Sequence, residues 1–190
     1  MAAKMPSKIV TTPIGRAAYV YLDEPDTGRE FSDGKYKVDL ILEPEKAKPL
    51  IDACKEVALK AFNTEDLTTI KVTAVKDGDD RPQPEPGEND RYKIFRGKAY
   101  VTAKTINSIV VRDAKGDKME AKDFYAGCYA RLKVKVAAYQ KGANKGITAY
   151  LIAAQFVADG EELGVSTDSF KAVTEDDMQE VLNLKDTIPF

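Results

Sequence analysis

Hydrophobic residues recur at every second position through most of this chain, which is the pattern of β-strands. Strand-like stretches cover residues 8–14, 17–22, 35–42 and 69–75, and more follow between residues 92 and 157. In the third stretch, alternation places Tyr36, Val38, Leu40 and Leu42 on one face. Residues 45–62 instead carry apolar side chains at helical spacing, which predicts the only strong helix before the C-terminal tail.

Turn-forming residues separate these segments. Residues 113–117 and 140–146 are predicted hairpin loops, and Asp159 with Gly160 begins another turn. The acidic, proline-rich segment 77–90 is predicted to be an extended and exposed loop. Several short strands with one helix favour a small antiparallel barrel or a sandwich with a helical insert.

Charge is distributed unevenly, although 29 basic and 31 acidic side chains almost cancel over the 190 residues. Residues 77–90 carry a net charge of −5, residues 91–146 carry +10, and residues 165–190 carry −4. This asymmetry favours a basic surface that meets a polyanion, with an acidic tail that acts separately. The alternative is that Lys and Arg only solvate strand edges.

The residue types present argue against an enzyme. The chain has no His, which is the commonest general base and metal ligand. Cys54 and Cys128 cannot make a disulfide framework or a four-ligand zinc site, and both fall on apolar faces, as packed and inert thiols do. The sequence lacks a phosphate-binding loop, a nucleophile elbow and a complete calcium loop. We therefore expect no catalytic residue, no metal and no cofactor.

The hydropathy pattern predicts a soluble protein of the cytoplasm. The longest run without a charged residue lies between Lys145 and Asp159 and has 13 residues. A membrane-spanning helix needs about 20. The N-terminal residues also lack the apolar core of a secretory signal. We expect no membrane partner.

Two strands carry cations around a tyrosine on one face and small or apolar residues on the other. The first basic face holds Arg96, Lys98, Tyr100, Thr102 and Lys104, and the second holds Tyr129, Arg131, Lys133 and Lys135. Neither face contains an acid, so we expect the cations to neutralise phosphates while Tyr100 and Tyr129 stack bases. Tyr139 is a further candidate, although the turn after residue 137 leaves the directions of Tyr139 and Tyr150 open. On the alternative interpretation the tyrosines cover barrel ends and the lysines protect edges.

The C-terminal residues suggest a separate function. Thr174 and Asp177 resemble an N-cap arrangement before a short apolar stripe, which predicts a helix of about two turns. Ile188, Pro189 and Phe190, with the terminal carboxylate, suit an apolar pocket rimmed by Arg or Lys.

Several segments together resemble a known family. They are GKYKVDLIL, RGKAYVTAKT, VVRDAKGD, DFYAGCYARLKVKVAAYQKGANKGI and QFVADGEELG, and they span roughly residues 34–164. The chain resembles the single-stranded DNA-binding proteins of tailed phages, and its IPF end is similar to the tip of bacterial single-stranded DNA-binding proteins. Bacterial members often stack bases on Trp, which this chain lacks, and their tip follows a run of Asp, where this chain has Lys185, Asp186 and Thr187.

The resemblance implies a mainly β protein with an OB-fold-like antiparallel barrel, one inserted α-helix and an acidic C-terminal tail. Residues 1–164 would form the nucleic-acid-binding domain and residues 165–190 the tail. The protein would coat single-stranded DNA, with little sequence preference, during phage replication and recombination. Asp186, Ile188, Pro189 and Phe190 would recruit replication or recombination proteins. A homo-oligomer is compatible with this pattern. An RNA-binding or strand-annealing OB-fold protein and a non-catalytic phage structural β-domain are the alternatives.

Overall fold

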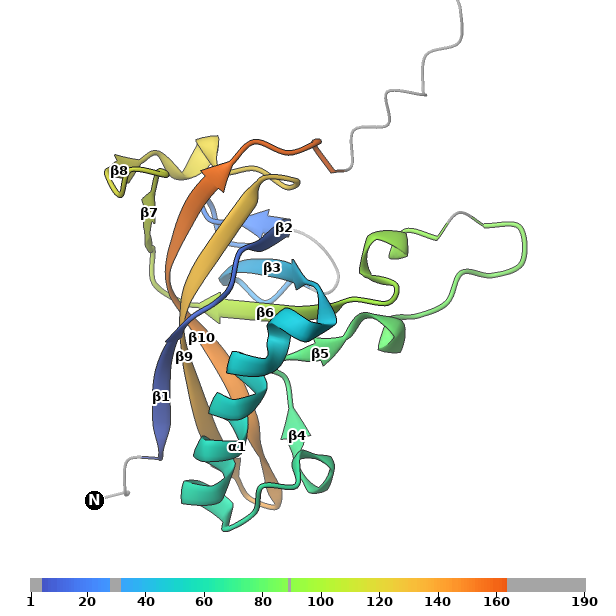
Figure 1. The fold of residues 1–190 in the computed structure, drawn as a ribbon, viewed down its shortest axis with the longest axis vertical. Coiled ribbons are helices and arrows are strands. Elements are labelled where there is room, and N and C mark those ends of the chain that lie inside the picture. The colour runs from blue at the N-terminus through green and yellow to red at the C-terminus, as the bar shows by residue number, and fades with distance from the viewer. Residues whose placement is uncertain (1–4, 28–31, 89, 164–190) are drawn as a thin grey trace, which may run out of the picture.

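Strands dominate the structure, which a computed structural model describes for residues 5–27, 32–88 and 90–163 (Figure 1). The strands are β1 (Ser7–Thr11), β2 (Gly15–Tyr21), β3 (Tyr36–Leu42), β4 (Lys71–Val72), β5 (Lys76–Asp77), β6 (Ala99–Thr105), β7 (Val110–Arg112), β8 (Lys118–Met119), β9 (Tyr129–Lys141) and β10 (Asn144–Ala158). The helix α1 spans Lys48–Phe62. Short 3-10 turns occupy Pro44–Ala47, Leu67–Thr69, Gly78–Asp80, Lys93–Phe95 and Ala121–Asp123. The described residues are therefore mainly β with one α-helix, as the sequence pattern predicts.

Backbone pairing closes a circuit of five strands. β9 pairs with β2, β2 with β3 and β3 with β6, all antiparallel. β6 then pairs in parallel with β10, which returns to β9 as an antiparallel hairpin. β1 extends the sheet along β9, and the β7–β8 hairpin joins it along β10. Because the circuit is closed, alternation along each strand sorts side chains into an inside and an outside.

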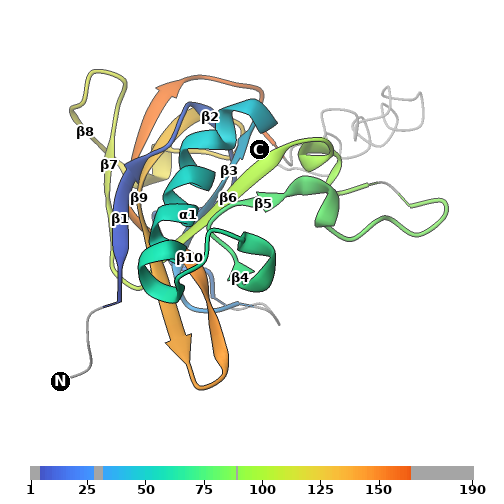
Figure 2. The same cartoon turned by 60° about the horizontal axis from the view of Figure 1, so that its bottom comes forward.

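The inside of the circuit is apolar. Ala130, Leu132, Val134 and Val136 of β9 are fully buried, which confirms the predicted inner face of that strand. α1 packs against β1, β9 and β10 and covers this core from one side (Figure 2). Its residues Leu50, Ala53, Cys54, Val57 and Ala58 join the same cluster.

The helix boundaries follow from local chemistry. Pro49 lies in the first turn, where its missing N–H is not needed. Asn63 ends the helix in the left-handed conformation, with φ of 53°, and its N–H donates to the Leu59 carbonyl. Burial raises the pKa of the Cys54 thiol to about 12 and that of Cys128 to about 11. Both thiols are therefore protonated near neutral pH, which agrees with packed, unreactive groups.

Two segments differ from the alternation pattern. Residues 69–75, predicted as one strand, do not form one. The chain pairs with β10 at β4 and then moves to β6, with which β5 pairs. The segment between β5 and β6 extends from the body as a long loop (Figure 1). It returns over the outer face, where Phe95 packs with Ala18, Ile41 and Tyr100 in a second apolar cluster. The β7–β8 pairing confirms the hairpin loop predicted at 113–117. The β9–β10 pairing confirms the second hairpin, but its loop is shorter than the predicted 140–146, because only residues 142 and 143 lie between the two strands.

Candidate nucleic-acid interface

One row of side chains crosses the outer faces of all five strands in the circuit. It consists of Lys135 on β9, Tyr150 on β10, Lys104 on β6, Lys37 on β3 and Tyr21 on β2. Each residue is the direct cross-strand partner of the next, and direct partners project to the same face of a sheet. Neighbouring strands lie ~4.8 Å apart, so the row spans roughly 19 Å across the strands. We call it the lysine–tyrosine row.

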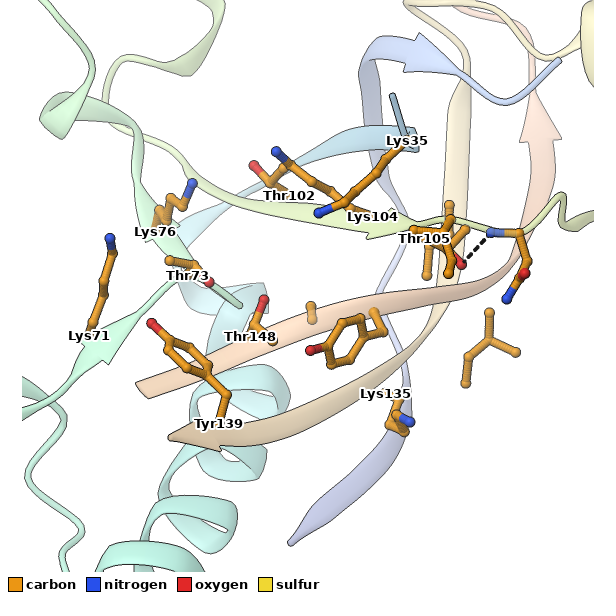
Figure 3. A pocket seen from close by; sticks show the side chains of 16 residues that line it. Lys35, Lys71, Thr73, Lys76, Thr102, Lys104, Thr105, Lys135, Tyr139 and Thr148 are labelled. Atoms are coloured by element: carbon orange, nitrogen blue, oxygen red, sulfur yellow. Dashed lines mark hydrogen bonds between the residues drawn. The ribbon is translucent and has the colours of Figure 1, made fainter. Parts of the chain in front are cut away.

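A groove of about 780 Å³ lies along the β9, β10 and β6 part of this row (Figure 3). Five lysines line it: Lys35, Lys71, Lys76, Lys104 and Lys135. None of the 16 residues that line this groove is an Asp or a Glu. Figure 3 shows Lys71 and Lys76 at one end, Lys135 at another side, and Tyr139 and Thr148 between them. This basic groove thus combines a cationic rim with a partly apolar floor.

Tyr150 is the exposed aromatic ring of the basic groove. The residue is 45% exposed, and the Lys135 ammonium nitrogen lies 5.4 Å from the centre of its ring. A cation over an aromatic face is attracted by the ring's quadrupole, which helps to fix the ring. Tyr139 lines the same groove and packs on Gly146, where a Cβ would lie 2.2 Å from the Lys71 carbonyl oxygen and 2.7 Å from the Tyr139 hydroxyl oxygen. Glycine therefore lets both the Lys71 backbone and the Tyr139 side chain approach β10 here.

The lysines of the groove lie close enough to repel one another. Burial lowers the pKa of Lys76 below its ordinary value, and the charges of Arg81, Lys104 and Lys71 lower it further against the opposing charge of Asp39. An anion placed among these cations would relieve the repulsion. The groove is therefore electrostatically suited to bind phosphate.

Lys104 is paired with an acid at the edge of the groove. Its ammonium nitrogen lies 2.7 Å from a carboxylate oxygen of Asp33. Burial alone would raise the pKa of Asp33, but the hydrogen bond from Lys104 brings it below its ordinary value. Because both side chains are partly solvent-exposed, such a pair is worth little and a phosphate can replace it.

A second pocket of about 620 Å³ continues from the basic groove and shares Lys76, Thr102 and Lys104 with it. Arg81 is the central residue of this pocket's wall. Its guanidinium carbon lies 4.0, 4.3, 5.1 and 5.4 Å from the ring centres of Phe95, Tyr100, Tyr92 and Tyr19, respectively. Arg81 also forms an ion pair with the buried carboxylate of Asp39. We call this group the Arg81 cage.

The prediction that Tyr100 stands on an exposed face is wrong. Tyr100 is only 6% exposed, because Phe95 packs against it in a T-shaped arrangement with the ring centres 5.1 Å apart and Arg81 covers it. Burial also raises the pKa of Tyr100. Alternation along β6 gave the correct side of the strand, but it could not reveal that a loop covers that side.

Arg96 and Lys98 are not the free cations that the sequence pattern predicts. Arg96 precedes β6, and its Nε lies 2.9 Å from Asp90 while its other nitrogens donate to the carbonyls of Arg81 and Pro82. Lys98 donates to both carboxylate oxygens of Glu43, at 2.8 and 2.7 Å. Neither acid lies in the strand itself, so the lack of acids in that stretch of sequence did not mean that the cations lack partners. Because the Lys98–Glu43 pair is partly exposed, like that of Lys104 and Asp33, the predicted phosphate contact of Lys98 stays a prediction.

The predicted cations and tyrosines of β9 separate into two groups. Lys135 and Tyr139 line the basic groove with Lys104 of β6. Tyr129, Arg131 and Lys133 lie further along the same outer face and do not line it. The exposed Tyr129 ring lies close to Gly160, at the turn after β10. The DNA-binding role of these three residues stays a prediction.

Sequence reasoning missed much of the row and rim. Lys35, Lys37, Lys71, Lys76 and Tyr21 were not singled out, and the direction of Tyr150 was left open. For two of them a signal existed, because Lys35 and Lys37 alternate with the buried face of β3. Lys71 lies in the stretch 69–75, which alternation treats as one strand although the structure divides it. Lys76 belongs to a strand of two residues, which is too short for alternation to show a face.

Comparison with known proteins identifies the family. A family model described as "Enterobacter phage Enc34, ssDNA-binding protein" matches residues 7–182. The chain belongs to this family. The resemblance drawn from the sequence is thereby confirmed, and the chain falls among phage single-stranded DNA-binding proteins, which are not catalysts. No curated protein matches the chain in sequence.

Solved structures of low sequence identity share the fold. The single-stranded DNA-binding protein from bacteriophage Enc34 aligns with a TM-score of 0.62 and 19% identity over 85% of this chain and 88% of that one. The same phage protein in complex with single-stranded DNA aligns with a TM-score of 0.62 and 17% identity over 82% and 89% of the two chains. Gp2.5, a single-stranded DNA-binding protein encoded by bacteriophage T7, aligns with a TM-score of 0.57 and 21% identity over 86% of this chain and 97% of that one.

Two further structural findings concern only the described residues. They contain no group of three or more Cys, Asp or Glu side chains placed to hold a metal ion. None of their helices has the length and apolar character needed to cross a membrane.

Proposed function

We propose that this protein coats single-stranded DNA through the basic groove, with little sequence preference, during phage replication and recombination. The observation that carries the proposal is the arrangement of five lysines, without a carboxylate among the lining residues, around the exposed ring of Tyr150. The five-strand circuit supports the finer description of the fold as an OB-fold barrel, an architecture that binds oligonucleotides across its strands. The Enc34 protein, which has the same fold, has been solved in complex with single-stranded DNA.

The geometry suggests how the strand is held. Phosphates would contact the lysines of the rim, while bases would stack on Tyr150 and contact Tyr139 and the apolar floor. Stacking is worth about 1–3 kcal/mol per base and tolerates any sequence, because every base has a π-face. The phosphate contacts release counterions, so they strengthen binding at low salt.

The acidic tail is proposed to compete with DNA for this groove. Residues 165–190 carry a net charge of −4 and end in Ile188, Pro189 and Phe190, outside the described residues. In this scheme DNA displaces the tail, and the tail then presents Asp186 and the three terminal residues to replication or recombination proteins. Deleting residues 165–190 should tighten binding of oligo-dT at low salt, as measured by fluorescence anisotropy. Weaker binding after the deletion would refute the competition.

The salt dependence of binding tests the proposed function. Five neutralised phosphates, at ~0.7 per phosphate on a single strand, give a slope near −3.5 for log affinity against log salt. We expect this slope in titrations of labelled oligo-dT by fluorescence anisotropy at several salt concentrations. A flat salt response would exclude the proposal. Titrations with RNA and duplex DNA of matched sequence, in the same buffers, test the choice of ligand. Tighter binding to either one than to single-stranded DNA would contradict single-stranded DNA as the ligand.

A further inference from the structure

Tyr19 occupies an unusual position in the second pocket. The pairing of β2 with β3 shifts register between Ala18 and Tyr21, which marks a β-bulge. Within this bulge Tyr19 has φ of 46°, in the left-handed region that residues other than glycine rarely adopt. Bulges and such strained residues concentrate at functional sites, where they aim a side chain. Here the bulge turns the Tyr19 ring into the pocket rather than toward the core.

The Tyr19 ring is held by Phe95 and Arg81 and is still partly exposed. It stacks on Phe95 with the ring centres 6.0 Å apart and the planes inclined by 21°, and Phe95 is fully buried. Arg81, held by its ion pair with Asp39, lies beside both rings. Tyr19 nevertheless remains 40% exposed. This combination gives a rigid aromatic surface that solvent can reach.

The surroundings of Tyr19 suit a nucleotide. Lys104 and Arg91 line the same pocket and could contact a phosphate. The two acids in the lining, Asp26 and Asp39, are buried and ion-paired with Lys37 and Arg81, respectively. Burial raises the pKa of Tyr19, so its phenol stays neutral and does not repel phosphate.

The second pocket is also continuous with the basic groove. The two share Lys76, Thr102 and Lys104, so a strand bound on Tyr150 can continue past Lys104 into the second pocket. We infer that Tyr19 is a second base-stacking platform, which binds a nucleobase of the same DNA strand that occupies the basic groove. This inference rests on the proposed function, because it requires single-stranded DNA in the groove.

A single-tryptophan reporter tests the inference, because the chain has no native Trp. The variant Tyr19→Trp places the only indole of the protein on the platform, where stacking by a base quenches its fluorescence. The matched control is Leu59→Trp, at a residue of α1 that is 44% exposed and outside both pockets. Tyr150→Trp reports on the basic groove. The ligand is an oligo-dT of about 25 nucleotides, longer than the ~4–16 nucleotides that one OB-fold covers.

We expect quenching in Tyr19→Trp and Tyr150→Trp and none in Leu59→Trp. Quenching at Tyr150→Trp but not at Tyr19→Trp would overturn the second platform and leave the basic groove intact. Absence of quenching at both positions would overturn the proposed function together with this inference.

A second measurement separates stacking from a merely structural role of Tyr19. Tyr19→Leu keeps apolar bulk against Phe95 but removes the aromatic face. We expect it to weaken binding of the long oligo-dT by about 5- to 150-fold. An oligo-dT of about four nucleotides, which fills only one platform, should lose far less. Equal losses for the two lengths would indicate a general disturbance of the fold and would contradict the second platform.

Discussion

Replacing Tyr150 by alanine should remove the main stacking surface of the basic groove. The side chain is 45% exposed, with the Lys135 ammonium group near its ring, so the fold should tolerate its loss. Tyr129 offers a matched control, because it lies on the neighbouring strand β9, is 43% exposed against 45% for Tyr150, and does not line the groove.

The expected loss follows from the contacts that Tyr150 offers. One base stacked on its ring contributes about 1–3 kcal/mol, which corresponds to a factor of about 5–150 in affinity. The cation–π contact with Lys135, worth about 0.5–1 kcal/mol at an exposed site, is present without DNA, so its loss leaves the lysine less ordered but does not add to the stacking loss. Tyr150→Ala should therefore weaken binding at least fivefold, and by more than Tyr129→Ala, because Tyr129 lies outside the basic groove.

Both variants would be titrated against labelled oligo-dT by fluorescence anisotropy, at one salt concentration and with melting temperatures measured alongside. Tyr150→Phe should retain most of the affinity, because the π-face remains. The reasoning is refuted if Tyr129→Ala loses as much affinity as Tyr150→Ala. That result would move the DNA path toward the other end of β9, as the sequence pattern first suggested.

Three further outcomes follow from the charges. Lys104→Gln should make the slope of log affinity against log salt shallower by ~0.7. Lys60→Gln, which removes a lysine paired with Glu56 on α1, should leave this slope unchanged. Equal slopes for the two variants would contradict the phosphate contact assigned to Lys104. Lys76, whose pKa is lowered by burial, must be protonated to bind phosphate, so affinity should be constant below that pKa and fall as pH rises through it. Lys76→Arg should shift this fall to higher pH, and an unchanged profile in pH-dependent titrations would argue against Lys76 as a phosphate contact. Arg96→Gln should lower the melting temperature, because it releases the loop that Arg96 holds, and leave the salt slope unchanged; a shallower slope would restore its predicted role at phosphate.

Alternation predicted the fold well where one face of a strand is buried. Along β9 the residues Ala130, Leu132, Val134 and Val136 are all buried, because the closed circuit gives every strand an inner face. The helix was equally predictable, because its apolar stripe has a different period. Each of these elements has one buried face, and the spacing of apolar residues in the sequence shows which face that is.

The candidate site was only partly predictable, because it depends on which strands become neighbours. Lys104 and Lys135 were expected to act together, and they do share a groove, but Tyr150 of β10 lies between them. Alternation predicts on which face of its strand a residue lies, but it does not predict which strand will pair with that strand. Likewise, the loop residue Phe95 covers Tyr100, a long-range contact that leaves no trace in the pattern of β6.

The central claim, that single-stranded DNA lies along the basic groove, can be measured on the unmodified protein by lysine footprinting. Lysines would be acetylated with and without a saturating oligo-dT, and the modification of each would be quantified by mass spectrometry. We predict protection of the five groove lysines, Lys35, Lys71, Lys76, Lys104 and Lys135, with Lys48 and Lys60 of α1 unaffected. Unchanged modification of the groove lysines, with protection elsewhere on the surface, would contradict the account.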